Sequence, residues 1–280
     1  MIGKIVRILY GCIPIRLQKA LGKSKMLRPI RNLILRPKGA FRETSVWVNR
    51  NYLEYQVSFK FYASLKVASK ADQSGIENTL LRNAISLVKE HKGINNKAVI
   101  FDVGANFGYL SLVWANSIAQ KGKVVAFEPN MNVIDSFKNS IQANNLNSII
   151  ELQNFAVGKE EGNIQLFLSP TTSNILRSNI QDKHSTSIEM VSLDAFSKRI
   201  GIKHCDLVKI DVDGIELDIL MGATHLIERC KPIFIVETNG DERIIDFFNE
   251  RDYKILDMKL KPFRSENQLP HNIFCIPKDD

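Results

Sequence analysis

From residue 98 onward, short apolar runs alternate with segments of helical character, and this alternation constrains the fold more than any other feature of the sequence. The apolar runs have no polar face, which is typical of strands buried on both sides. Strands are expected at 98–103, 123–128, 149–154, 206–212 and 232–238. Helices are expected at 108–120, 131–144, 215–229 and 241–250. The pattern predicts an α/β fold whose doubly wound (Rossmann-like), mostly parallel sheet carries helices on both faces.

Segments outside this alternation predict further elements. Two apolar runs at 253–258 and 272–277, joined by a loop that contains proline, predict a C-terminal antiparallel hairpin. Alternating apolar residues within 46–66 indicate an N-terminal hairpin, and apolar residues at helical spacing indicate a helix at 76–91. One more strand is expected around 164–168.

The net charge of +8 is concentrated at the N-terminus. Residues 1–42 hold eleven Lys or Arg and no Asp or Glu, which leaves 27 basic against 30 acidic residues in the rest of the chain. We therefore expect a basic, partly helical N-terminal extension over 1–75 and an α/β domain over 76–280.

The basic extension has three possible explanations. Its Lys and Arg, interspersed with Ile, Leu and Tyr, favour peripheral contact of residues 1–42 with an anionic membrane, or a solubilising helical cap. Binding to nucleic-acid phosphates is the less favoured explanation.

Other sequence features point to the cytoplasm. No apolar run approaches the roughly 20 residues that span a bilayer. The apolar start lacks the small-residue cleavage site of a signal peptide, and the four cysteines are far apart with no CxxC pair. A cytoplasmic protein is expected, peripheral at the inner membrane face if the extension binds lipid.

The loop after the first expected strand carries the clearest functional signal. Asp102 lies near the end of that strand, and Gly104, Ala105, Asn106 and Gly108 then lead into a helix. Glycine at these positions allows a tight turn, close approach of a ligand and close helix–strand packing. A dinucleotide fingerprint requires G-x-G-x-x-G, which this loop lacks. An acid at the strand end repels phosphates but suits the cationic methionine part of S-adenosyl-L-methionine.

The second expected strand also ends in an acid. Glu128 stands twenty residues after Gly108 and is followed by Pro129 and Asn130. A carboxylate at this position can accept both ribose hydroxyls of an adenosine. The alternative is a surface Glu that caps the next helix. The two loops together favour S-adenosyl-L-methionine as the cofactor.

The fourth expected strand carries charge inside the sheet. Period-2 alternation places Leu207, Lys209 and Asp211 on one face of it. A lysine inside a central strand is costly unless it is paired, and Asp211 is close enough to pair with it. Such a strand neighbours the one that ends in Asp102, and ligands bind at that switch point. Asp211 is therefore expected to face the reacting group, unless it only caps the following helix.

Three motifs resemble class I methyltransferases. They are Asp102–Gly108, Phe127-Glu128-Pro129-Asn130 and the segment Lys209–Ala223. The last resembles the FkbM family in particular, whose usual form is K-I-D-V-E-G-x-E; here Asp213 replaces the usual Glu. The resemblance covers about 98–258. It implies a fold that binds S-adenosyl-L-methionine and an activity that O-methylates hydroxyls, often on sugars or natural products.

The resemblance also implies further cofactor contacts by position. Asn154, Phe155 and Ala156 would lie beside the adenine, and Tyr109 beside the methionine moiety.

Methylation of a hydroxyl requires in-line alignment of the acceptor oxygen and a base for its proton. Asp211 is the first candidate, followed by Glu216 and Glu237, with Lys209 holding the carboxylate or polarising the acceptor. Glu216 has an alternative role, which is to complement the positive end of its helix. Asp211 and Glu237 end neighbouring strands and could share Mg²⁺, although no spacing demands a metal.

Two observations bear on the chemical class of the methyl acceptor. The polar stretch 169–187 suits a hydroxyl-rich acceptor, and a solvated surface loop explains it equally well. No N-P-P-Y or D-P-P-Y tetrad follows the fourth strand, which weakens methylation of nucleic-acid amines. The main prediction is O-methylation of a hydroxyl on a sugar, glycan or natural product. The alternatives are a catalytically weak binding module and an RNA-directed methyltransferase that uses the basic arm.

Overall fold

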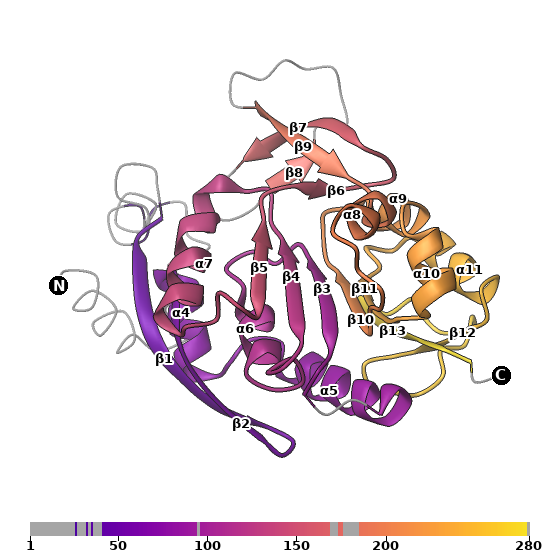
Figure 1. Ribbon diagram of the computed structural model, residues 1–280, viewed down its shortest axis with the longest axis horizontal. Helices are drawn as coiled ribbons and strands as arrows, with labels where there is room; N and C mark the ends of the chain where they lie inside the picture. Colours follow the sequence, from indigo (N-terminus) through magenta and orange to yellow (C-terminus); the bar gives the residue numbers. More distant parts are fainter. Residues whose placement is uncertain are drawn as a thin grey trace.

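The computed structural model describes residues 41–93, 96–168, 173–175 and 185–278, together with residues 26, 32 and 35. Its centre is a seven-stranded sheet in the order β12-β13-β11-β10-β3-β4-β5. The parallel strands are β3 (Val99–Val103), β4 (Lys123–Phe127), β5 (Ile150–Gln153), β10 (Leu207–Ile210) and β11 (Ile233–Glu237). The strand order reverses between β3 and β10, which is where doubly wound sheets bind ligands. The predicted Rossmann-like fold is confirmed (Figure 1).

The C-terminal hairpin is also confirmed. It consists of β12 (Tyr253–Leu256) and β13 (Asn272–Pro277), which pair antiparallel. β13 adds antiparallel to β11, with Glu237 opposite Asn272. This pairing brings the segment before β13 to the carboxyl end of β11.

Each face of the sheet fills its own hydrophobic core. Ile100, Val124 and Leu207 contribute to one core, and their neighbours Phe101, Val125 and Val208 to the other. Alternate residues of a strand point to opposite faces, so a strand buried on both sides is apolar on both faces except where a charged side chain is paired. The first face is covered by α5 (Asn78–Lys92), α6 (Tyr109–Ala115) and α7 (Met131–Ala143). The second is covered by α8 (Leu193–Arg199), α9 (Glu216–Met221), α10 (Thr224–Cys230) and α11 (Arg243–Asn249).

The helix expected at 215–229 is two helices in the structure, so that boundary was wrong. α9 ends at Met221, and α10 begins at Thr224. Gly222 packs against the backbone of Gly158 and Lys159, where any side chain would clash. Its carbonyl accepts a hydrogen bond from the backbone of Asp194 (3.0 Å), which ends the helical ladder there.

The N-terminal hairpin is confirmed and belongs to the main core. β1 (Glu43–Tyr52) and β2 (Tyr55–Ser64) pair antiparallel, and α4 (Leu65–Gln73) follows. Phe59 and Phe61 meet the ring of Tyr109 edge-on, at 5.6 and 5.3 Å between ring centroids. Residues on both sides of position 75 thus share one core. The functional division of the chain at residue 75 stays a prediction.

A small second sheet lies across the carboxyl ends of β4 and β5 (Figure 1). Its order is β6-β9-β7-β8, with β6 (Ala156–Val157), β7 (Gly162–Leu168), β8 (Ser173–Ile175) and β9 (Ser185–Val191). β7 is the strand expected around 164–168. Most of the polar stretch 169–187 and of the basic extension lies outside the described residues. None of the helices in the described segments is both long and apolar enough to cross a membrane.

Candidate active site

The loop between β3 and α6 turns against the end of β10. Gly104 and Gly108 have positive φ angles of 79° and 78°. The backbone N–H of Asp211 donates to the carbonyl of Val103 (3.1 Å), which brings the two strand ends into contact and leaves no room for a side chain on Gly104. A side chain on Gly108 would clash with the ring of Phe137. The loop therefore depends on both glycines.

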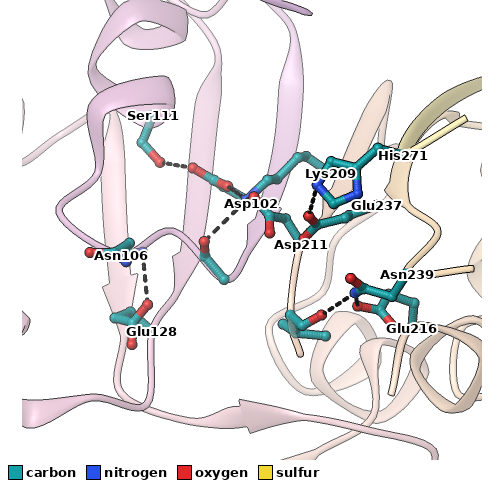
Figure 2. Close-up of polar contacts among 12 residues, drawn as sticks. Asp102, Asn106, Ser111, Glu128, Lys209, Asp211, Glu216, Glu237, Asn239 and His271 are labelled. Atoms are coloured by element: carbon teal, nitrogen blue, oxygen red, sulfur yellow. Dashed lines mark hydrogen bonds and ion pairs between the residues drawn. The ribbon is translucent and has the colours of Figure 1, made fainter. Parts of the chain in front are cut away.

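Glu128 stands at the end of β4 and is held by backbone N–H groups of two loops. Its Oε2 accepts from the N–H of Asn106 (2.7 Å; Figure 2), and its Oε1 accepts from the N–H of Asn130 (2.8 Å). Burial raises the pKa of Glu128 to about 7, although the two N–H bonds oppose that rise. Each carboxylate oxygen has a second acceptor site, so the group can still bind two hydroxyls.

Lys209 is the buried cation at the centre of the site. Its Nζ donates to the carbonyl of Gly104 (3.1 Å) and lies 3.1 Å from Asp211 Oδ2 and 3.6 Å from Asp102 Oδ1. Burial disfavours its charge, but Asp211 and Asp102 more than offset this effect and raise the pKa of Lys209. The expected pairing of Lys209 with Asp211 is present, and Asp102 joins it.

Asp102 faces inward. Only 1% of its surface is exposed, and its Oδ2 accepts a hydrogen bond from Ser111 Oγ (2.5 Å). Burial raises the pKa of Asp102, while Lys209 and Ser111 lower it. The carboxylate therefore contacts Lys209 and the helix that follows the glycine loop, on the buried side of the loop.

Asp211, Glu237 and His271 form a second polar group beside Lys209 (Figure 2). Glu237 ends β11, its Oε1 contacts His271 Nε2, and its carboxyl shares a hydrogen bond with Asp211. Burial and Asp211 raise the pKa of Glu237 to about 8. The pKa of Asp211 falls to about 2, because Lys209 and the bond from Glu237 outweigh its burial. The two carboxyls together hold one proton and one negative charge at neutral pH.

Two adjoining cavities flank the glycine loop, and Gly104, Asn106 and Asp211 line both. The first has a volume of about 210 Å³, and its wall combines the carboxylates of Glu128, Asp211 and Asp213 with apolar side chains. The second has a volume of about 330 Å³ and lies toward the N-terminal hairpin. Its wall includes Phe61, Lys70, Glu77, Tyr109 and Lys209, so the segment before residue 75 helps to build it.

Ten of the sixteen residues singled out from the sequence line one of these cavities. They are Gly104, Ala105, Asn106, Tyr109, Glu128, Pro129, Phe155, Ala156, Lys209 and Asp211. The six that line neither are Asp102, Gly108, Asn130, Asn154, Glu216 and Glu237.

Several of these six support residues that do line a cavity. Asn154 Nδ2 donates to the backbone carbonyl of Glu128 (2.9 Å). Glu216 is 2% exposed, and its Oε1 accepts from the N–H of Gly214 (3.1 Å) and from Asn239 Nδ2 (2.6 Å). Burial raises the pKa of Glu216. The side chain anchors the loop after β10, and the structure does not place it on a cavity wall.

The sequence interpretation missed Ser111 and His271. The signal for Ser111 is its position nine residues after Asp102, on the inward face of α6, the helix that follows the glycine loop. The signal for His271 is its place just before β13, because pairing of the expected C-terminal hairpin with β11 brings it to Glu237. Within the described residues, no group of three or more His, Cys, Asp or Glu side chains has the arrangement of a metal site.

The strand order, the glycine loop and the acidic strand tips define a Rossmann-like fold with a candidate ligand site where the strand order reverses. The family model "Methyltransferase FkbM domain" matches residues 102–255, more than half of the chain, and the protein belongs to that family.

Two curated relatives resemble this chain. The hexuronic acid methyltransferase AglP of Haloferax volcanii is 29% identical over 131 residues, which are 46% of this chain and 52% of that protein. Methyltransferase 1 of Beauveria bassiana is 23% identical over 144 residues, 44% of this chain and 57% of that protein. The chain thus matches little more than half the length of these relatives.

Solved structures show likeness in fold alone. Methyltransferase FkbM from Methylobacillus flagellatus has a TM-score of 0.43 and 13% identity, and the match covers 75% of this chain and 65% of that one. An O-methyltransferase from Bacillus cereus, solved in complex with SAH, has a TM-score of 0.43 and 12% identity over 72% of this chain and 82% of that one.

Proposed function

We propose that the protein is an S-adenosyl-L-methionine-dependent O-methyltransferase whose acceptor is a hydroxyl on a sugar or glycan. One observation carries the proposal: Glu128, Gly104 and Asp211 border one cavity at the carboxyl ends of adjacent strands. This cavity offers a carboxylate for a ribose, bare backbone for close approach and a second carboxylate beside them.

The residues present suit this cofactor. Glu128 would bind the ribose hydroxyls, and the apolar wall that includes Phe155 and Ile215 would flank the adenine. The methionine end would extend past Gly104 into the second cavity, toward Tyr109. When bound, the cofactor supplies an electrophilic methyl group on a positively charged sulfur.

Asp211 is the group positioned to meet the acceptor. It lines both cavities, and half of its side chain is exposed. Lys209 keeps this carboxylate ionised and fixes its direction. An ionised carboxylate can orient an acceptor hydroxyl and receive its proton. The relative whose name specifies a hexuronic acid supports a sugar as the acceptor class.

Binding and turnover test the proposal separately. Calorimetry with S-adenosyl-L-methionine should show binding by wild type that Glu128→Ala weakens by at least about tenfold, because hydrogen bonds to a charged group contribute roughly 1.5–3 kcal/mol. Glu228→Ala removes an exposed carboxylate and should leave the affinity unchanged. Folded wild type that does not bind the cofactor would overturn the proposal.

The acceptor is tested with cofactor labelled in its methyl group. Hexuronic acids, neutral hexoses and RNA are offered in parallel, and we expect label in a sugar. The labelled product should resist mild alkali, because a methyl ether is stable there and a methyl ester is cleaved. Label in RNA would contradict the proposed sugar or glycan acceptor, and label in an alkali-labile ester would contradict a hydroxyl acceptor.

A further inference from the structure

Three ionisable side chains lead from the cavities to the protein surface. Asp211 lines both cavities, Glu237 lies behind it with 16% of its side chain exposed, and His271 is 71% exposed at the outer end. Each comes from a different segment: the end of β10, the end of β11 and the turn before β13. The N–H of Thr238 donates to the carbonyl of His271 (2.8 Å), so the backbone keeps the contact between Glu237 and His271 in place.

We propose that Asp211, Glu237 and His271 form a proton path that carries the proton of the acceptor hydroxyl from the active site to solvent. The path rests on the proposed function, because only an acceptor that loses a proton needs it. In this path Asp211 touches the acceptor, while Glu237 and His271 act through it.

The charges around the carboxyl pair explain why an outlet is needed. Glu237 faces Asp211, Lys209, Glu216 and His271. The pair holds one proton at neutral pH and binds a second only near pH 2, the pKa of Asp211. A proton taken from a hydroxyl therefore cannot stay on the pair. The exposed imidazole of His271 contacts Glu237 and is the neighbouring group that can receive it.

The proton balance closes over one reaction cycle. The acceptor oxygen forms a C–O bond as the C–S bond breaks, the electrons of that bond stay on sulfur, and the hydroxyl proton goes to Asp211. The carboxyl pair then holds two protons. One leaves Glu237 Oε1 for His271 Nε2, and the exposed imidazole releases it to water. The pair returns to one proton and one negative charge.

The electrostatic coupling between His271 and the Asp211–Glu237 pair can be measured without turnover. We would follow the ring resonances of His271 by NMR against pH and assign them with His271→Gln. In Asp211→Asn, Glu237 loses the neighbour that keeps it protonated and becomes the charged member, in contact with His271. The titration midpoint of His271 should then rise by about 0.5 pH unit or more. Asp241→Asn, which removes a carboxylate paired with Arg243, should leave it unchanged. An unmoved midpoint in Asp211→Asn would overturn the path.

Kinetics test whether the path is used. His271→Gln should lower kcat by about tenfold and leave both KM values within about twofold, because the side chain contacts neither substrate. Free imidazole should restore activity to His271→Ala. The matched control is His225→Gln, which removes a histidine that lies beside Glu228 on the surface, and it should match wild type.

The possible outcomes are distinct. A changed KM with an unchanged kcat, or no rescue by imidazole, would show that His271 serves structure alone and would refute the path. If treatment of wild type with EDTA lowers kcat as much as His271→Gln does, the residues would serve a metal ion and the proton path would be refuted. Absence of methyl transfer by wild type would refute the proposed function itself, and the NMR linkage would still report whether the three groups share protons.

Discussion

A methyl group on Gly104 would lie 2.0 Å from the carbonyl oxygen of Asp211. The turn that begins the cofactor loop and the residue placed at the reacting centre are therefore in backbone contact, 107 positions apart in the sequence. Any change that opens this contact must also move Asp211 relative to the loop.

Gly104→Ala should abolish cofactor binding and destabilise the fold. Its φ of 79° is unfavourable for alanine by roughly 1–2 kcal/mol, and the clash with Asp211 adds to this. Gly201→Ala is the matched control, because Gly201 has a φ of 67° but nothing within 4 Å of the new methyl group. Urea unfolding and calorimetry measure both variants. Equal destabilisation of the two would contradict a specific role for the Gly104–Asp211 contact.

Cofactor affinity should depend on pH through Glu128. The raised pKa of about 7 means that the free protein must lose a proton before the carboxylate can accept two ribose hydroxyls. Affinity should therefore fall about tenfold for each pH unit below 7, and Glu128→Gln should bind weakly with no such dependence. A wild-type affinity that is flat between pH 5.5 and 8 would argue against ionised Glu128 as the ribose ligand.

The same pKa has a consequence for the stability of the free protein. The folded state binds the Glu128 proton more tightly than the unfolded chain, whose ordinary pKa is 4.5. The contribution of Glu128 to the free energy of unfolding is therefore fully present below pH 4.5 and is lost as the pH rises toward 7. The difference in unfolding free energy between wild type and Glu128→Gln, measured by urea unfolding across this range, should narrow at low pH. A difference independent of pH would contradict the shift.

Lys209→Met should destabilise the protein by about 3 kcal/mol or more, because it leaves the buried carboxylate of Asp102 without its cation. The double variant Lys209→Met/Asp102→Asn should recover part of this loss, since no uncompensated charge then remains. Lys278→Met removes an exposed lysine near Asp252 and should change stability by less than about 0.5 kcal/mol. Strict additivity of the two buried substitutions would show that the residues do not interact.

We expect the basic segment 1–42 to bind anionic membrane surfaces. Its eleven positive charges and absence of acids should attract phosphatidylglycerol vesicles at low salt, and binding should weaken as salt screens the charges. Sedimentation with phosphatidylglycerol and with phosphatidylcholine vesicles measures this. A variant in which Arg28, Arg31 and Arg36 are glutamine should bind less. No binding to anionic vesicles at low salt would reject the membrane role.

Local sequence was sufficient for the sheet and for much of the cavity wall. Strands buried on both faces are largely apolar, so β3, β4, β10 and β11 could be recognised from their apolar runs, although Asp102 and Lys209 interrupt two of them. Gly104 and Glu128 were recognisable because parallel strands have their carboxyl ends at the same edge of the sheet, where ligands bind in folds of this class. The break between α9 and α10 could not be predicted, because it depends on contact of Gly222 with a distant loop.

The amino-acid sequence by itself determined the order of strands and helices, the turn chemistry of the glycine loop and which acids stand at strand tips, since these depend on neighbours along the chain. Only the tertiary structure decided where those acids point. Asp102 points inward to Lys209 and Ser111, and Glu216 holds the loop after β10 through Asn239. Glu237 contacts His271, a residue that the sequence patterns did not single out. The physical reason is that the energy of a charge depends on its burial and its partners, and both are set by segments that meet only when the sheet is assembled.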